Sequence, residues 1–273
     1  MSSSPVQNDP TLAVVYRTVT NRVATVVINR PEARNALNRE VRDLLPKVLA
    51  QANEDPEVDV IILTGTDPAF TAGLDLKELG GGGNQISLAK HDAAPLPKRP
   101  FPDLDKPLIG AINGVAITGG FELALNCDLL IASERAAFAD THARVGVMPG
   151  WGLTTLLADV VGVRRAREIS LTGNFVSARQ ALDWGLVNHV VTHPDLLPFT
   201  QKLAEDMVGN DQRGVRQMLR TYRQVGESTV GDGSQIEATE AWRFEKERAF
   251  DPAEVEARRT AIMDRGRGQV RLA

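Results

Sequence analysis

Residues 112–128 read INGVAITGGFELALNCD. The stretch passes from apolar, strand-like residues through the diglycine Gly119-Gly120 into a helix-like segment with a single carboxylate, Glu122. Glycine lets a ligand approach the backbone, and the free N–H groups at the start of a helix stabilise an anion. Glu122 would lie one turn further on, close enough to move a proton on that ligand. The alternative is a tight strand-to-helix turn in which Glu122 only complements the helix dipole.

A second glycine-opened turn lies earlier in the chain. Residues 58–64 have the composition of a buried strand, and residues 67–78, DPAFTAGLDLKE, follow as a turn that leads into another helix start. Gly73 frees the backbone around Leu74. If the N–H groups of Leu74 and Gly119 converge on one oxygen, they form a two-donor oxyanion hole, which stabilises an enolate or a tetrahedral anion.

The order of strands and helices indicates the α/β class. Strand-like and helix-like segments alternate through the first part of the chain, and Asn38 is expected to cap a helix over 39–53. The later part carries many charges and few β-branched residues, which predicts helices. The expected strands cover 12–18, 22–29, 58–64, 107–113, 128–132 and 187–191, and the expected C-terminal helices cover 196–208, 214–226, 236–250 and 252–265. We therefore divide the chain into a core, 1–194, and a C-terminal helical region, 195–273.

Composition and missing motifs exclude several classes of function. The net charge of −4 over 273 residues predicts no nucleic-acid partner, and neither a dinucleotide fingerprint after the first strand nor a P-loop pattern is present. The single Cys127 is expected to be a buried, inert thiol. No apolar run is long enough to span a membrane and residues 1–10 lack the layout of a signal peptide, so a cytoplasmic protein is expected. The histidines lack the spacing of metal ligands, so no metal site is expected.

Segments spread over almost the whole chain make it resemble the crotonase (enoyl-CoA hydratase/isomerase) superfamily. They occur in the family's order: Ile28–Leu37, Ala69–Leu76, Lys106–Gly114, Gly119–Glu122, Cys127–Asp128, Phe138–Pro149, and Leu171–Gly173 with Ala181–Val187. The resemblance implies a spiral of ββα turns, acyl-CoA substrates of lipid and fatty acid metabolism, and no cofactor beyond the coenzyme A that the substrate carries. It also implies a homotrimer or a dimer of trimers, with the C-terminal region helping to join subunits.

The resemblance also assigns site residues. The N–H groups of Leu74 and Gly119 would polarise the thioester carbonyl, and Glu122 would move a proton. Ala33 and Arg34 align with the segment that touches coenzyme A, where Arg34 could pair with a phosphate or remain a solvated loop residue. The remaining substrate-binding positions are Ala72, Asp75, Leu76, Gly120 and Trp151. Trp151 is bulkier than the residues common at its position, which hints at a short or unusual acyl chain.

One position departs from the hydratase pattern. Typical hydratases carry two glutamates, and alignment through Phe138 and Pro149 places the second on His142. Histidine keeps a proton carrier but changes its charge and basicity, and its unperturbed pKa of about 6.5 predicts a limb of the pH–rate profile near neutrality. His142 could instead be a polar residue of the pocket wall. Asp140 is interpreted as a turn residue rather than as the working carboxylate.

Hydration of a trans-2-enoyl-CoA to a 3-hydroxyacyl-CoA is the reaction that the resemblance favours, with Glu122 and His142 as the catalytic pair. The alternatives are another reaction of the superfamily, namely isomerisation, hydrolysis or retro-aldol cleavage. A different class also stays open, a non-catalytic acyl-CoA-binding scaffold that lost half of its acid–base pair. Retention of Glu122 beside an intact diglycine favours the enzyme, because a binding module hardly needs the carboxylate.

Overall fold

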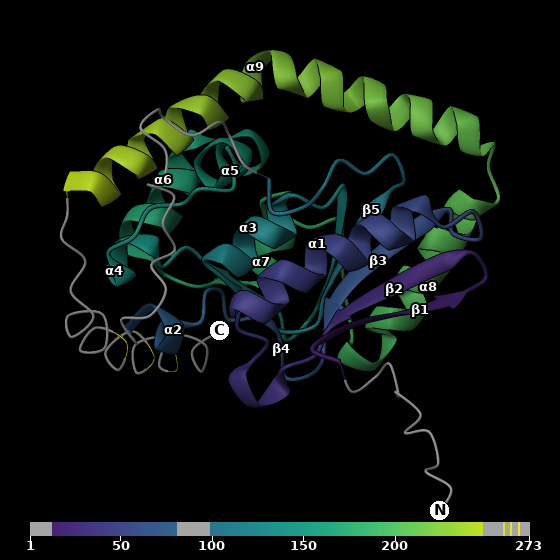
Figure 1. Ribbon diagram of the computed structural model, residues 1–273, viewed down its shortest axis with the longest axis horizontal. Helices are drawn as coiled ribbons and strands as arrows, with labels where there is room; N and C mark the ends of the chain where they lie inside the picture. Colours follow the sequence, from purple (N-terminus) through teal and green to yellow (C-terminus); the bar gives the residue numbers. More distant parts are fainter. Residues whose placement is uncertain (1–12, 81–98, 248–258, 260–262, 264–266, 268–273) are drawn as a thin grey trace, which may run out of the picture.

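The fold is built on two sheets. The computed structural model describes residues 13–80 and 99–247 together with positions 259, 263 and 267 (Figure 1). The larger sheet has the strand order β1-β2-β3-β5-β7-β10, and all its pairs are parallel except the antiparallel β1–β2 hairpin. Its strands are β1 (Val15–Thr20), β2 (Val23–Ile28), β3 (Val60–Gly65), β5 (Leu108–Ile112), β7 (Leu129–Ser133) and β10 (His189–Val191).

The smaller sheet holds the strands that follow directly in the chain. Its order is β4-β6-β8-β9, and β4, β6 and β8 pair in parallel. These strands are β4 (Ala69–Thr71), β6 (Val115–Ile117), β8 (Ala137–Ala139) and β9 (Val176–Ser177). Each turn of the chain thus adds one strand to each sheet and then a helix, namely α2 (Leu76–Gly80), α3 (Gly119–Leu125) or α4 (His142–Val145). The expected ββα spiral is confirmed, whereas strands this short left no periodicity for a sequence prediction to detect.

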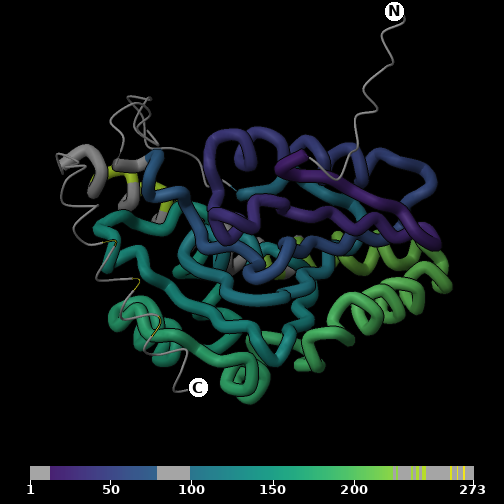
Figure 2. The backbone as a smooth tube through the Cα atoms, turned by 90° about the horizontal axis from the view of Figure 1, so that it is seen from below, coloured from purple at the N-terminus to yellow at the C-terminus, as the bar shows by residue number. Residues whose placement is uncertain are grey.

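Helices cover both faces of the larger sheet, as the view from below shows (Figure 2). Alternate residues of β3 point to opposite faces: Ile61 and Leu63 pack with α1 (Arg39–Glu54), and Val60 and Ile62 pack with α8 (Leu196–Val208). The predicted cap of α1 is confirmed, because the Asn38 side chain accepts the N–H of Val41 at 3.0 Å. Three more helices complete this core: α5 (Leu153–Val161), α6 (Val163–Thr172) and α7 (Ala178–Asp183).

The C-terminal region differs from its prediction. Instead of separate helices over 214–226 and 236–250, the chain forms one long helix, α9 (Gln212–Glu247), which crosses the top of the molecule in Figure 1. The predicted helix over 252–265 falls largely outside the described residues. Among the helices of the described part, none is both long enough and apolar enough to cross a membrane.

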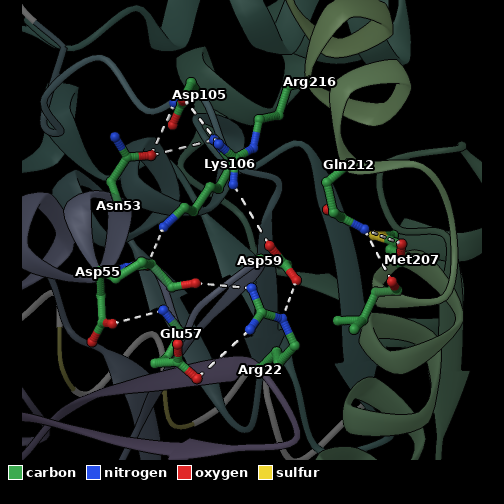
Figure 3. A network of polar contacts seen from close by, with 12 residues as sticks. Arg22, Asn53, Asp55, Glu57, Asp59, Asp105, Lys106, Met207, Gln212 and Arg216 are labelled. Atoms are coloured by element: carbon green, nitrogen blue, oxygen red, sulfur yellow. Dashed lines mark hydrogen bonds and ion pairs between the residues drawn. The ribbon is translucent and has the colours of Figure 1, made fainter.

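A network of charges fastens the start of α9 to the sheet (Figure 3). The buried carboxylate of Asp59 pairs with Arg22 and lies 3.6 Å from the guanidinium of Arg216 on α9. Next to it, the buried Lys106 ammonium donates to the carbonyls of Ala52 and Asp55, at 3.1 and 2.7 Å, where α1 ends. Burial, together with the charge of Arg216, lowers the pKa of Lys106. The network is therefore structural, since Lys106 is held by backbone carbonyls while Arg22 and Arg216 face carboxylates.

Candidate active site

The two glycine-opened turns lie against each other. Leu37 and Leu74 form an isolated parallel bridge, with the Leu37 N–H donating to Gly73 O at 2.8 Å. Gly73 has a φ of +84°, and a Cβ built there would lie 2.4 Å from Ile117 O and 3.4 Å from the nitrogen of Gly119. Within the described part of the chain, the N–H groups of Leu74 and Gly119 donate to no protein acceptor. Both amides are therefore free to serve an oxygen of a ligand.

Thr118 holds the second turn in a strained conformation. Its φ of 54° and ψ of −115° lie outside the allowed regions of a β-branched residue. Two hydrogen bonds keep it there: the Thr118 N–H donates to Ala139 O at 2.9 Å, and its hydroxyl lies 2.6 Å from that of Thr141. Strained backbone of this kind persists only where the surrounding structure holds it, and it is found mostly at functional sites. Here it orients the peptide group that carries the Gly119 N–H.

Behind these turns, three buried polar side chains lie in a row. The Glu122 carboxylate accepts the N–H groups of Gly150 and Trp151 through Oε1, at 3.1 and 2.7 Å. Its Oε2 lies 3.5 Å from His142 Nε2, and His142 Nδ1 lies 2.6 Å from Asp140 Oδ1. All three side chains are almost inaccessible to solvent. As expected of a turn residue, Asp140 accepts the backbone N–H of His142 at 3.1 Å, and its buried carboxylate also contacts the imidazole of that residue.

A cavity of about 690 Å³ lies beside these turns. Of the predicted site residues, it is lined by Ala33, Arg34, Ala72, Leu74, Asp75 and Leu76. Glu122, His142 and Gly119 are not part of its wall. The wall does include Thr118, which precedes Gly119, and Thr141, which precedes His142. The cavity and the buried row thus meet at these two threonines.

Two predicted binding residues have other surroundings. Gly120 packs on the small sheet, where a Cβ would lie 2.6 Å from Thr71 O. Trp151 is not part of the cavity wall, but its Cζ3 atom lies 3.2 Å from a Cβ built on Gly119, where Leu74 also comes close. Its backbone N–H donates to Glu122 Oε1 at 2.7 Å.

Several residues that line the cavity were not predicted from the sequence. On one side they are apolar, namely Val115, Ile117, Val145, Val147 and Phe175, and from the C-terminal region they are Arg259, Met263 and Arg267. The latter three repeat every four residues, which is the spacing of one helix face. Arg259 and Met263 lie within the helix predicted over 252–265 and Arg267 two residues beyond it, so their spacing was a usable signal for a cavity-facing side.

Comparison with known proteins agrees with this geometry. The Enoyl-CoA hydratase/isomerase family pattern matches residues 18–251. The chain belongs to this family. It is 39% identical over 230 residues to a probable peroxisomal enoyl-CoA hydratase 1 of Arabidopsis thaliana, covering 83% of this chain and 82% of that protein. Crystal structures of enoyl-CoA hydratases from Mycobacterium smegmatis and Mycobacterium tuberculosis are 47% and 46% identical, each with a TM-score of 0.78, covering 86% of this chain and 100% and 99% of theirs.

The charge of His142 follows from its buried surroundings. Burial alone would lower the pKa of His142, but hydrogen bonds with Asp140 and Glu122 and the charges of both carboxylates outweigh burial and raise it to about 9. The same contact keeps the pKa of Asp140 low despite its burial, helped by a hydrogen bond with Ser170. His142 is therefore an imidazolium at neutral pH. This raised pKa predicts that the pH limb expected near neutrality shifts toward alkaline pH.

The other described histidines serve the fold of this family member. His193 bridges two elements: its Nδ1 lies 3.0 Å from the hydroxyl of the buried Ser133, and its Nε2 lies 2.9 Å from Asp67 Oδ2. His189 packs its ring on Phe199, with centroids 5.1 Å apart. The Ser133 hydroxyl has no access to a substrate, so this row of serine, histidine and aspartate is no nucleophile site. His91 lies outside the described residues.

Proposed function

We propose that this member of the family is an enzyme that adds water to a trans-2-enoyl-CoA and gives a 3-hydroxyacyl-CoA. One observation carries the proposal: a carboxylate and an imidazolium face each other across 3.5 Å beside two unoccupied backbone donors. The carboxylate can take a proton from water, and the imidazolium can give one to carbon. The amides of Leu74 and Gly119 can meanwhile stabilise an enolate oxygen.

The proposed hydration begins at Glu122. Glu122 removes a proton from water, whose oxygen bonds to C3 while the C2–C3 π electrons move toward the thioester oxygen. The N–H groups of Leu74 and Gly119 hold the resulting enolate. C2 then takes the Nε2 proton of His142 as the carbonyl re-forms. Transfer of the proton from Glu122 to His142 Nε2, 3.5 Å away, restores the starting state.

The cavity is suited to the coenzyme A part of this substrate. Arg34 and Lys77 on its wall supply positive charge for phosphates, and Ala33 and Ala72 leave room for a chain beside the backbone. Arg30 also lines the cavity, and its Nη1 atom donates to Asp75, at 3.2 Å, and to Ala36 O, at 2.6 Å, which holds its guanidinium in the wall. Coenzyme A enters as part of the substrate, and no further cofactor is proposed.

A panel of acyl-CoA thioesters tests the reaction. Short and longer trans-2-enoyl-CoAs are followed by loss of the enoyl absorbance, 3-enoyl-CoAs by isomer analysis, and saturated and 3-hydroxyacyl-CoAs by release of free thiol or of cleavage products. We expect hydration of an enoyl-CoA to be the fastest of these reactions. Faster thiol release, isomerisation or cleavage would replace hydration by a sister reaction, and binding without any turnover would favour the scaffold.

The quaternary structure and the compartment are also proposals. The long α9 leaves Met218 and Tyr222, one helical turn apart, largely exposed, which suits contact with a second copy. We propose a homotrimer or a dimer of trimers, to be measured by light scattering coupled to size-exclusion chromatography. The cytoplasm remains the proposed compartment, to be tested by cell fractionation.

A further inference from the structure

Asp140 is the one buried carboxylate of the row that has no part in the proposed reaction. Its Oδ1 atom accepts two hydrogen bonds from His142, one from the backbone N–H at 3.1 Å and one from Nδ1 at 2.6 Å. A third contact comes from Ser170 on α6. Asp140 is only 2% exposed, so these contacts are made almost without water. A carboxylate held so tightly to a histidine determines both the orientation and the charge of that ring.

The orientation follows from the geometry. With Nδ1 donating to Asp140, the ring cannot flip without losing a short hydrogen bond, and Nε2 is left facing Glu122. The charge follows from the surroundings, since burial would otherwise favour the neutral ring. An imidazolium between two carboxylates leaves one net negative charge, whereas two glutamates with a buried aspartate would bring three acidic groups together. Asp140 and His142 therefore form one unit.

We propose that Asp140 is the positioning residue that lets His142 replace the second glutamate of the hydratase pattern, by fixing Nε2 toward Glu122 and keeping its proton in place. The inference rests on the proposed function for the identity of the reaction. It adds that the replacement works only as a pair of residues, the aspartate two positions before the histidine.

The groups that face His142 are few among the described residues. Asp140 faces it from its own segment, and Glu122 faces it from α3. Arg144, also on α4, reaches away toward α6, where its guanidinium donates to Thr172 O at 2.7 Å and to Asn174 at 3.2 Å. Ser170, the contact from α6, carries no charge. Protonation of His142 thus depends on two carboxylates, and removal of Asp140 should change it strongly.

The first experiment substitutes Asp140→Asn and measures kcat and KM across pH. We expect kcat to fall about 10- to 100-fold, the range seen when a carboxylate that orients a metal-bound histidine is removed. KM should change little, and the alkaline limb should move toward lower pH because one of the two stabilising carboxylates is gone. A purely structural Asp140 would lower the melting temperature and leave the limb in place, which would overturn the proposal.

A double-mutant cycle gives a second test that does not depend on the folding of one variant. His142→Glu recreates the two-glutamate pair but places a new carboxylate against Asp140. In that background Asp140→Asn should be neutral or should raise kcat, because it removes the repulsion between like charges, whereas it harms the parent. Equal losses in both backgrounds would show that Asp140 does not act through His142.

A titration without substrate separates this inference from the proposed function. The chain has 4 histidines, so labelled imidazole signals can be followed by NMR and the signal of His142 assigned with His142→Gln. In the parent His142 should titrate near the alkaline end, and in Asp140→Asn markedly lower. The matched control is Asp67→Asn, which removes the carboxylate facing His193 and should leave His142 unmoved. Unchanged titration in Asp140→Asn would overturn the positioning role even with an active enzyme, and a lowered titration would retain it even if hydration fails.

Discussion

The two carboxylate oxygens of Glu122 have different surroundings. Oε1 is held by the N–H groups of Gly150 and Trp151, and Oε2 is left facing His142. Two backbone donors fix Oε1, and Oε2 faces the imidazolium of His142. Isosteric replacement of Glu122 tests whether its carboxylate takes part in turnover.

Glu122→Gln should lower kcat about 100- to 10,000-fold, the usual contribution of a general acid or base. The amide oxygen can still accept both N–H groups, so the fold and the binding of acyl-CoA should persist. Calorimetric titration with the 3-hydroxyacyl-CoA product checks binding, and steady-state kinetics check turnover. Glu134→Gln, an exposed carboxylate at the end of β7, is the control. Turnover near that of the parent would remove Glu122 from the reaction.

His142→Ala should remove the alkaline limb of the pH–rate profile and reduce hydration about a hundredfold or more. The pKa of His142 is raised to about 9, so the parent should hold its activity through neutral pH and lose it only as the ring deprotonates. Initial rates between about pH 6 and pH 10 measure the effect, since histidine without perturbation would titrate near about 6.5. If the variant keeps the profile of the parent, His142 is a wall of the site.

At the scale of elements, the site depends on where two short turns meet. Gly73 and Gly119 belong to consecutive ββα units, and the parallel pairing of β4 with β6 brings the ends of these strands together. The strained Thr118 then aims the next peptide group. Replacing a backbone donor therefore requires a change that removes the N–H and keeps the turn.

Gly119→Pro meets this requirement. Gly119 is the first residue of α3, a helix position that tolerates proline, and the substitution deletes the N–H. We expect kcat/KM to fall by about 2 to 4 kcal/mol of transition-state stabilisation. Gly119→Ala is the comparison, because it keeps the N–H but places a Cβ 3.2 Å from the Trp151 ring. Should a folded proline variant keep full activity, the Gly119 amide is no oxyanion donor.

Gly120→Ala tests packing rather than chemistry. The new Cβ would lie 2.6 Å from Thr71 O in the small sheet, so unfolding free energy should fall by about 1 to 3 kcal/mol. Gly226→Ala in α9 is the matched control: a Cβ there meets nothing within 4 Å, and the helix should gain up to about 1 kcal/mol. Urea denaturation of both variants measures the difference. Equal stability of the two would mean that the small sheet yields to the new methyl group.

For the whole molecule, the charged row couples stability to pH. The pKa of His142 is about 9 in the folded protein, against about 6.5 in an unfolded chain. A raised pKa contributes stability that is complete below the unfolded value and is lost as pH rises through the folded value. The window is therefore neutral to alkaline. Since one pKa unit corresponds to about 1.4 kcal/mol, the contribution is on the order of 3 kcal/mol.

We thus expect the unfolding free energy of the parent to decline between about pH 7 and pH 10. His142→Gln, which carries no titrating proton, should flatten that decline. Urea unfolding at a series of pH values measures both slopes, and His193→Gln serves as the control for a histidine outside the row. A decline of the same steepness in His142→Gln would assign the pH dependence to other groups.

The sequence by itself determined much of this protein. Strand and helix periodicity, the Asn38 cap and the order of the motifs predicted the α/β spiral and the positions of Glu122, Leu74 and Gly119, because local spacing and family motifs are written along the chain. It also located the departure at His142. Six of the predicted site residues line the cavity, since they belong to the turn around Gly73 and to the segment around Ala33.

Only the tertiary structure decided what these residues do together. The sequence predicted separate helices over 214–226 and 236–250, but α9 is one helix, anchored by Arg216 on Asp59 and by Arg223 on Asp128 at 3.0 Å. Asp140 was predicted only as a turn residue, but its buried carboxylate lies 2.6 Å from the His142 ring. The charge of that ring also depends on Glu122, which belongs to a different helix. Solvent exclusion and the distance between charges arise when remote segments pack, and these two quantities set a pKa.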